Sequence, residues 1–224
     1  TGELLGEVAD GNPEHATQAI EAAHKALNLW SQETAYVRSN LLYKAHTLML
    51  EKHQALAELM TREQGKPLKA SMNEVKYAAD FFLWYAEEAK RVYGETIASA
   101  RTDQRFLVQK QPVGVVGAIT PWNYPISLFA RSVAVSLVVG NTIVIKPPEL
   151  CPISSNIFGR IFYEISIPEG ILNIVHGVGE ITGKKLVDHN SINQIVFTGS
   201  TEVASEILKA TADRIIPCHL ELGG

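Results

Sequence analysis

The sequence contains little cysteine, no long apolar run and no excess of charge of one sign. Only two of its 224 residues are cysteines, Cys151 and Cys218, so a disulfide framework is excluded. Neither cysteine stands at a metal-ligand spacing, and we expect no metal site and a reducing location, the cytoplasm. No segment approaches the ~20 apolar residues that span a bilayer, and nothing at Thr1 resembles a secretory leader. No membrane association is therefore expected.

The charge balance gives no reason to expect a nucleic-acid partner. The formal net charge is −4, from 20 Lys and Arg against 24 Asp and Glu. A chain that binds phosphate backbones carries a basic face, and none is evident here. With 46% apolar and 20% charged residues, the sequence is typical of a globular protein with one large domain.

Residues 13–92 are predicted to be helical. Apolar residues recur at intervals of three and four, as at Ile20, Ala23 and Leu27. Asn12 followed by Pro13 provides an N-cap and a first helical residue. A later helix carries an aromatic stripe, Tyr77, Phe81, Phe82 and Trp84, for which we expect core packing.

From residue 104 the pattern changes to strands that alternate with short helices. Residues 105–109 indicate a mixed strand, and apolar runs occupy residues 113–119, 142–145, 172–175 and 195–197. Such runs predict strands buried on both faces. Helical segments begin near Pro125, Ser154, Glu180 and Thr201. The α/β fold class follows: a doubly wound, Rossmann-like parallel sheet preceded by an N-terminal helical layer. Ligands bind beyond the carboxyl ends of such strands, so the loops there are the candidate sites.

The loop after the first apolar run holds Asn123 between two prolines, Pro121 and Pro125. Because the prolines restrict the backbone, the carboxamide has little freedom and could serve in an oxyanion hole. An Asn that caps the helix starting at Pro125 is an equally good interpretation.

The next loops suggest a dinucleotide. Lys146 and Glu149 follow the second run, where a carboxylate can bind ribose hydroxyls and repel a 2′-phosphate; an ordinary solvated pair is the alternative. The glycines of residues 177–183 miss both the Walker A and the G-x-G-x-x-G spacing by one residue. After the fourth run, Gly199 and Ser200 open a helix whose N-terminus suits a pyrophosphate, and Ser200 could equally be its N-cap.

The last strand ends in Glu221, followed by two glycines. A carboxylate at a strand end, beside backbone that a ligand can approach closely, is a candidate general base. A surface glutamate before a turn is the simpler interpretation of this residue by itself.

Taken in order, the motifs Pro-Trp-Asn-Tyr-Pro, Ile-Lys-Pro-Pro-Glu, Phe-Thr-Gly-Ser-Thr-Glu and Leu-Glu-Leu-Gly-Gly resemble the aldehyde dehydrogenase family. The likeness extends over essentially the whole chain and includes Glu-Gln-Gly-Lys-Pro at residues 63–67. It implies that residues 1–224 are the N-terminal, cofactor-binding portion, with the catalytic domain missing. Within the family, the sequence is most similar to enzymes for small polar or carboxylated aldehydes, such as succinate-semialdehyde and lactaldehyde dehydrogenases.

The resemblance implies that a cysteine thiolate adds to the aldehyde, and that hydride transfer and hydrolysis of the thioester yield the acid. The nucleophile would lie downstream of this chain, since Cys151 and Cys218 match no catalytic position. Asn123 would hold the oxyanion and Glu221 would activate water. NAD is the expected cofactor, with NADP less favoured because of Glu149. The implied cofactor-binding residues are Thr120, Pro121, Trp122, Lys146, Glu149, Gly179, Gly199, Ser200, Val203 and Leu222.

Substrate contacts are expected from Tyr124, Leu128 and Arg131. Arg131 lies seven residues after Tyr124, on the same helix face, where bulky-aldehyde relatives carry an aromatic residue. A guanidinium there would clamp a carboxylate or hydroxyl at the far end of the substrate; an ion pair with a helix neighbour is the alternative.

Residues 95–111 match the family's bridging strands, so a homo-oligomer, a dimer or tetramer, is expected of the full protein. A catalytically inactive nucleotide-binding fragment is the alternative function. A short-chain reductase is excluded because no tyrosine has a lysine four residues later.

Overall fold

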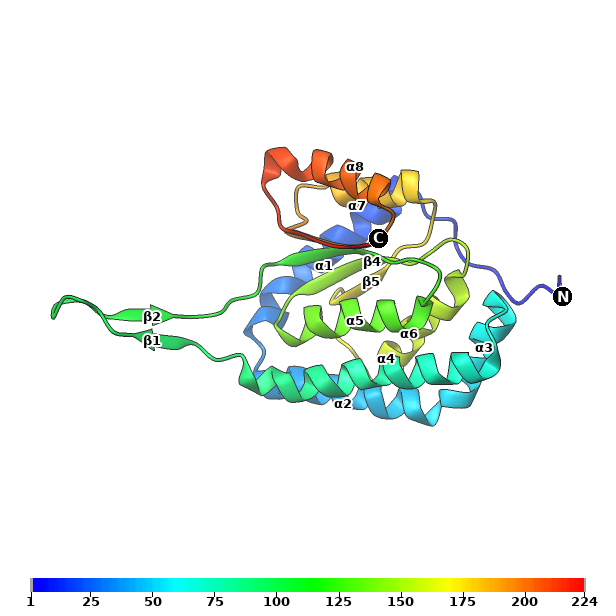
Figure 1. Cartoon of the computed structure of the whole chain (residues 1–224), viewed down its shortest axis with the longest axis horizontal. Helices are drawn as coiled ribbons and strands as arrows, with labels where there is room; N and C mark the ends of the chain where they lie inside the picture. The colour runs from blue at the N-terminus through cyan, green and yellow to red at the C-terminus, as the bar shows by residue number, and fades with distance from the viewer. Residues whose placement is uncertain (1, 224) are drawn as a thin grey trace.

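A five-stranded parallel sheet organises the chain (Figure 1). The computed structural model describes residues 2–223; Thr1 and Gly224, the last residue of the Leu-Glu-Leu-Gly-Gly motif, lie outside the described residues. The strands follow the order β5-β4-β3-β6-β7, and each pairs in parallel with its neighbour. Their bounds are β3 Val115–Ile119, β4 Thr142–Lys146, β5 Leu172–Ile174, β6 Gln194–Gly199 and β7 Cys218–Leu222. The predicted doubly wound sheet is confirmed, and its strand order reverses between β3 and β6.

Burial differs between the centre and the edges of this sheet. β4 is buried throughout and β3 nearly so, as the apolar runs predict. Successive residues point to opposite faces, so Val115 and Val116 belong to different core clusters. The prediction of burial on both faces is wrong for the edge strand β5, which is half-buried, and for β6, where Ile195 and Phe197 are buried but their neighbours are not. β5 has no neighbouring strand on one side, so its side chains are covered less completely. β6 lies between β3 and β7, and its buried residues Ile195 and Phe197 pack on one face, in the same cluster as Val115 and the helices that cover that face.

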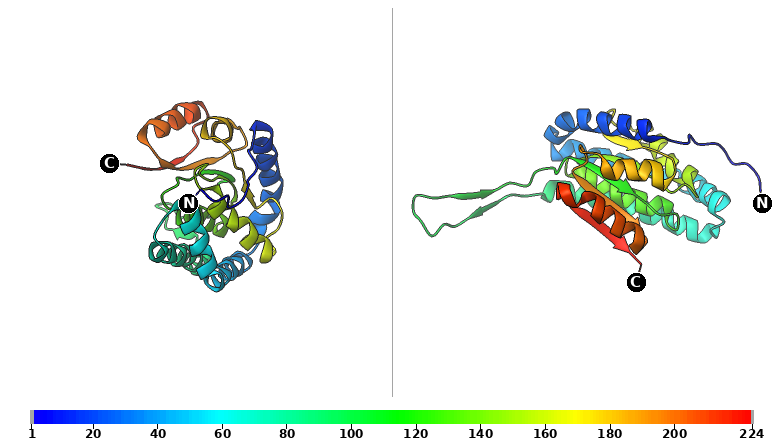
Figure 2. Two further views of the ribbon diagram at one scale, coloured as in Figure 1. Left: turned by 90° about the vertical axis from the view of Figure 1, so that its right-hand side faces the viewer. Right: turned by 90° about the horizontal axis from the view of Figure 1, so that it is seen from above.

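Helices cover both faces of the sheet (Figures 1 and 2). One face carries α1 (Pro13–Gln32), α7 (Lys184–Asp188) and α8 (Thr201–Thr211), packed through apolar side chains such as Ile20, Leu186 and Ile207. The π-helical turn η2 (Gly179–Gly183) leads directly into α7. The other face carries α5 (Pro125–Val138) and α6 (Pro152–Glu164). As predicted, Asn12 caps α1 and Pro13 begins it.

A further layer of helices packs outside α5 and α6. It consists of α2 (Ala35–Glu51), α3 (His53–Gln64) and α4 (Leu68–Glu88), followed by the short η1 (Ala89–Arg91). The predicted N-terminal helical layer is these three helices, whereas α1 lies on the opposite face of the sheet. Gly65 ends α3 in the left-handed conformation, with φ 76°, where glycine has no steric penalty.

The aromatic stripe on α4 is divided between core and surface. Phe82 is fully buried and packs edge-on against Phe162, as core packing requires. Tyr77 and Trp84 are 58% and 62% exposed, so the prediction of core packing is wrong for these two side chains. The stripe is wider than the part of the helix that faces α5, and its flanks therefore reach solvent.

A hairpin of β1 (Glu95–Ile97) and β2 (Phe106–Val108) projects away from the body of the molecule (Figures 1 and 2). Both strands are exposed along their whole length. The predicted strand within residues 105–109 is confirmed, and its partner in this chain is β1. Whether the hairpin also pairs with a second subunit stays a prediction.

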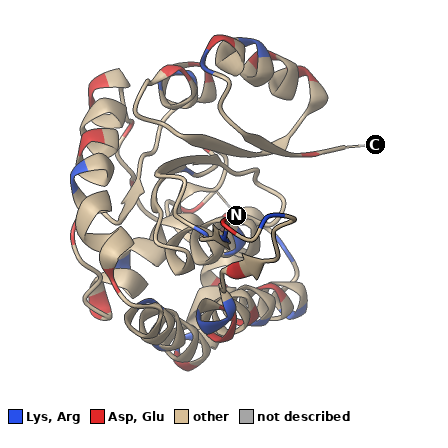
Figure 3. Ribbon diagram, turned by 90° about the vertical axis from the view of Figure 1, so that its left-hand side faces the viewer, with Lys and Arg blue, Asp and Glu red and all other residues tan. Residues whose placement is uncertain are grey.

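The surface mixes both signs of charge. In Figure 3, acidic and basic residues are interspersed along the helices. Among residues 2–223, no helix combines the length and the apolarity that crossing a membrane would require.

Candidate functional site

Two cavities meet at the carboxyl ends of the strands. The helix cavity, about 530 Å³, lies between the tips of β3, β4 and β6 and the helices α7 and α8. The edge cavity, about 810 Å³, lies between the tip of β7, the start of α5 and the start of α8. They share wall residues from two strand ends: Pro121, Trp122, Thr198, Gly199 and Ser200. Both therefore open where the strand order reverses, the position at which doubly wound sheets bind ligands.

The helix cavity contains nearly all of the residues expected to bind a cofactor. Its volume is that of a typical small-molecule site. From the predicted set it is lined by Thr120, Pro121, Trp122, Lys146, Glu149, Gly179, Gly199, Ser200 and Val203. Leu222 is the exception, since it lines the edge cavity instead.

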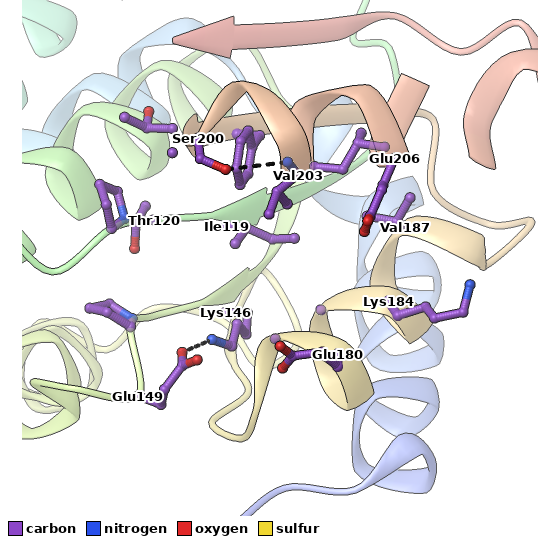
Figure 4. Close-up of a pocket in the computed structure, with 18 of the residues that line it drawn as sticks. Ile119, Thr120, Lys146, Glu149, Glu180, Lys184, Val187, Ser200, Val203 and Glu206 are labelled. Atoms are coloured by element: carbon purple, nitrogen blue, oxygen red, sulfur yellow. Dashed lines mark hydrogen bonds and ion pairs between the residues drawn. The ribbon is translucent and has the colours of Figure 1, made fainter. Parts of the chain in front are cut away.

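Lys146 and Glu149 form an ion pair in the wall of the helix cavity (Figure 4). The ammonium group of Lys146 is buried with its side chain 3% exposed, while Glu149 is about half exposed. Burial would raise the pKa of Glu149, but the hydrogen bond from Lys146 and the N–H groups of Glu149 and Gly179 outweigh it and lower the pKa. The alternative, that Lys146 and Glu149 are an ordinary solvated pair, does not fit because Lys146 is buried. A charged carboxylate therefore faces the cavity at neutral pH.

The tip of β6 places backbone close to both cavities. A Cβ on Gly199 would clash with the ring of Phe197, so a larger residue there would require that ring to move. Ser200 is the N-cap of α8 and accepts a hydrogen bond from the N–H of Val203 at 3.3 Å, as the capping interpretation predicts. The N-terminus of α8, which favours negative charge, therefore opens at the junction of the cavities.

Thr120 supplies a polar atom that lacks a partner. Its side chain is 5% exposed, and its Oγ1 makes no hydrogen bond within the described chain. A buried hydroxyl without a partner is costly and calls for an explanation. Because Thr120 lines the helix cavity, the simplest explanation is a ligand with a donor or acceptor at that point, which fits a dinucleotide.

The edge cavity brings together the two predicted catalytic residues, Asn123 and Glu221. Asn123 Oδ1 accepts a hydrogen bond from the N–H of Tyr124 at 3.1 Å. The N-cap of α5 is Tyr124, and no side chain of its own sequence neighbourhood caps the helix, so the interpretation of Asn123 as that cap is wrong. With its oxygen engaged, the amide has its N–H₂ group left to donate.

The predicted substrate residues Tyr124, Leu128 and Arg131 line the same cavity. Arg131 Nη2 donates to Thr198 Oγ1 at 3.2 Å, and no ion pair to Arg131 occurs among residues 2–223. The alternative of an ion pair with a helix neighbour is therefore wrong. Thr198 is also the residue that pairs in register with Glu221. The guanidinium of Arg131 therefore lies at the same side of the edge cavity as the carboxylate of Glu221.

Neither cysteine has the surroundings of a nucleophile. Cys151 is buried, and its Sγ points to the backbone oxygen of Trp122 at 3.5 Å. Burial, together with the charges of Glu63 and Glu74, raises the pKa of Cys151 to about 12. A reactive thiol needs the opposite shift. Cys218, expected to be buried, is half-buried on β7 and lines neither cavity.

Sequence reasoning missed two groups of residues. Charged side chains of η2, α7 and α8 also line the helix cavity: Glu180, Lys184, Asp188 and Glu206. The intervals of four between Glu180, Lys184 and Asp188 were an available signal for one helix face, whereas Glu206 lies on another helix. The second group, Glu63, Lys66 and Glu74, reaches the same loops from the outer helical layer. No local pattern signals such long-range contacts.

Comparisons with known proteins agree with this geometry. The model of the aldehyde dehydrogenase family matches residues 1–224. A probable succinate-semialdehyde dehydrogenase [NADP(+)] of Sinorhizobium fredii is 45% identical over 100% of this chain and 46% of the relative. The crystal structure of an NADP-dependent enzyme of E. coli superimposes with a TM-score of 0.98 at 39% identity, covering 100% of this chain and 47% of that one.

A third structure was solved with a bound dinucleotide. Betaine aldehyde dehydrogenase of Staphylococcus aureus, in complex with NAD+, superimposes with a TM-score of 0.96 at 34% identity, over 99% of this chain and 46% of that one. The chain spans about half the length of the relatives that it matches. The family match, the similar sequences and the strand-tip cavities together show that this chain belongs to the aldehyde dehydrogenase family.

Proposed function

We propose that the protein containing this chain oxidises a small carboxylated aldehyde, such as succinate semialdehyde, to the acid, with NAD as the hydride acceptor. The observation that carries the proposal is that Asn123, Glu221 and Arg131 line one cavity, which shares a wall with the helix cavity. A substrate in the first would adjoin a cofactor in the second. The cysteine nucleophile would lie downstream of this chain.

The helix cavity would hold the cofactor, which supplies hydride acceptance when bound. Glu149 would accept hydrogen bonds from the adenosine ribose, and Lys146 would hold that carboxylate in place. The N-terminus of α8 at Ser200 would meet the pyrophosphate, and the free Oγ1 of Thr120 would find its partner. Gly179 and Val203 would flank the adenine.

The charge on Glu149 favours NAD over NADP. A carboxylate beside the ribose repels a 2′-phosphate, and the lowered pKa of Glu149 keeps that charge at neutral pH. The similar S. fredii protein is named for NADP(+), whereas the S. aureus structure contains NAD+. The relatives' names therefore leave the choice open, and the affinities of this chain for the two cofactors would decide it.

In the edge cavity, the N–H₂ group of Asn123 would donate to the aldehyde oxygen as the thiolate adds and negative charge develops there. Glu221 would then take a proton from the water that hydrolyses the thioester. Both roles require exact placement, because a donor stabilises charge only when it already points at the oxygen.

The substrate would lie against Tyr124 and Leu128, with its far end at Arg131. A guanidinium that has one hydrogen bond, to Thr198, retains donors for a carboxylate. The name of the S. fredii relative, a succinate-semialdehyde dehydrogenase, supports a substrate with that group.

In the whole protein, residues 1–224 would form the greater part of the cofactor-binding domain. The exposed hairpin, within residues 95–111, would bridge subunits of a homo-oligomer. The low cysteine content favours a cytoplasmic location.

A second candidate is a nucleotide-binding protein without dehydrogenase activity. It is favoured by the absence of either cysteine from the edge cavity. Formation of NADH from succinate semialdehyde and NAD discriminates the two. We expect none from this chain, and thiol-sensitive formation once the downstream segment is restored. Cofactor binding without NADH formation in the longer protein, with any of several small aldehydes, would favour the second candidate.

A further inference from the structure

The helices α5 and α6 begin in the same unusual way. Each starts with proline, Pro125 or Pro152, and neither is capped by a side chain from its own N-cap residue. A helix N-terminus exposes N–H groups that need acceptors, above all when it is buried. Both helices follow loops that line the cavities, so their first turns determine where those loops lie.

Carboxylates from the outer helical layer cap both helices. Glu74 Oε1, on α4, accepts from the N–H groups of Ile126 and Ser127 at 3.0 and 3.2 Å. Glu63, on α3, uses both of its oxygens: Oε1 accepts from the N–H of Ile153 and Oε2 from that of Ser154, at 2.7 Å each. The two caps are equivalent in position, the second and third residues of a proline-initiated helix. They differ in what else they contact.

Among residues 2–223, only the cap on α5 includes a cation. Lys66 forms an ion pair with Glu74 Oε2, and the Glu74 side chain is wholly buried. Lys66 Nζ also donates to the backbone oxygen of Asn123 at 3.0 Å and lies 3.9 Å from the ring centroid of Tyr124. Lys66 and Glu74 therefore hold the backbone of Asn123 on one side of Tyr124 and the start of α5 on the other.

Stability by itself does not call for such a pair. A buried ion pair can usually be replaced by apolar side chains of similar size without loss of stability. Apolar side chains could not, however, bond the Asn123 carbonyl and the Ile126 and Ser127 N–H groups. An apolar replacement would therefore leave the backbone from Asn123 to Ser127 without the hydrogen bonds that fix its position.

We propose that Lys66 and Glu74 are positioning residues that set the direction of the Asn123 amide, a role that rests on the proposed function. Asn123 is exposed, and its side chain bonds no described residue other than its own neighbour, Tyr124. Its amide can thus point reproducibly at a developing oxyanion only if its backbone is fixed. Lys66 and Glu74 provide the charged hydrogen bonds that do so.

The test compares Lys66→Met, Glu74→Gln and the double variant in the longer, active protein. Gln can still accept from the N–H groups but cannot balance Lys66. We expect each single variant to lower the melting temperature and the double variant to recover most of it, because both charges leave together. We expect kcat to fall about tenfold or more in Lys66→Met and to stay low in the double variant, with KM for NAD unchanged. Recovery of kcat together with stability would overturn the proposal.

Glu63→Gln is the control, because it replaces one of the two carboxylate oxygens that cap α6 and does not reach Asn123. It should lower the melting temperature while kcat at saturating NAD stays within about twofold of wild type. Lys66→Arg should restore part of the kcat that Lys66→Met loses. A loss of kcat in Glu63→Gln equal to that in Lys66→Met would mean that loss of stability, not of positioning, lowers activity.

Amide hydrogen exchange in this chain separates failure of the positioning role from failure of the proposed function. Glu74→Ala should accelerate exchange at Ile126 and Ser127 but not at Ile153 and Ser154; Glu63→Ala should do the reverse. If these shifts appear and the wild-type longer protein oxidises no aldehyde, the proposed function fails while the backbone contacts stand. If exchange at Ile126 and Ser127 is unchanged, the positioning role fails.

Discussion

The two cavities at the strand tips differ in how completely this chain builds them. In the helix cavity, the buried Lys146 orients Glu149 and the walls come from three strands and two helices. In the edge cavity, the predicted catalytic side chains are exposed, and Trp122 and Tyr124 are 55% and 49% exposed. A doubly wound sheet can thus form a cofactor site from its own loops. We propose that the catalytic site needs a further wall from the rest of the protein.

Substitution of Glu221 should change kcat more than any other substitution considered, and it should leave the affinity of the helix cavity for NAD unchanged. In the longer protein, Glu221→Gln should lower kcat about 10²–10⁴-fold, because the amide cannot take a proton from water. Since Glu221 lies outside the helix cavity, NAD affinity measured on this chain should be the same in both forms. Loss of NAD affinity in Glu221→Gln would contradict this and would mean that the two cavities function as one site.

Asn123→Ala should have the next largest effect. Removal of one oxyanion donor lowers kcat by about 10²–10³-fold. The melting temperature should change little, because the Asn123 side chain is exposed and bonds no described residue other than its neighbour Tyr124. Steady-state kinetics and calorimetry on the longer protein measure both quantities. An unchanged kcat would mean that Asn123 does not stabilise the oxyanion.

Glu149→Ala tests the helix cavity, with a smaller effect. Loss of the carboxylate removes the repulsion of a 2′-phosphate, and the neighbouring Lys146 would then favour it. We expect the ratio of NAD to NADP affinity to fall about tenfold, equivalent to about 1.4 kcal/mol. Titrations of both cofactors into this chain suffice. Should wild type already prefer NADP, Glu149 does not set the choice.

The smallest expected effect is on pH. Because the pKa of Glu149 is lowered, the folded protein retains the charged carboxylate to more acid pH than a free glutamate would. The affinity of this chain for NAD should therefore change less than about twofold between pH 8 and pH 5.5, and decline only as the pH falls through the lowered pKa. A decline centred near pH 6 would indicate a different group, such as a histidine.

The sequence predicted the parts of this account that depend on local pattern. Apolar runs located β3 and β4, and the positions of Lys146, Glu149 and Glu221 at or just beyond strand ends located the cavities. It could not predict that Glu74 caps a helix 52 residues away, because that contact depends on tertiary packing. Nor could helical periodicity alone show that Tyr77 and Trp84 lie on the exposed flanks of α4.

The direction of the Asn123 amide also lay beyond local pattern. Two prolines made a helix cap and an oxyanion donor equally reasonable. In the structure, Asn123 Oδ1 accepts from the N–H of Tyr124 and the side chain does not cap α5, so its N–H₂ group is the end left to donate; the oxyanion role stays a prediction. Side-chain direction in a short loop is set by such contacts, which spacing does not specify.

Calorimetric titration of NAD into this 224-residue chain measures whether the chain forms a cofactor site without the rest of the protein. We expect one molecule of NAD to bind per chain. Its affinity should be unchanged in Arg131→Met, which removes a side chain that lines the edge cavity and not the helix cavity, and lower by about tenfold in Lys146→Met, which removes the buried cation beside Glu149. Absence of binding to the wild-type chain, or equal weakening by both substitutions, would contradict a cofactor site that this chain builds by itself.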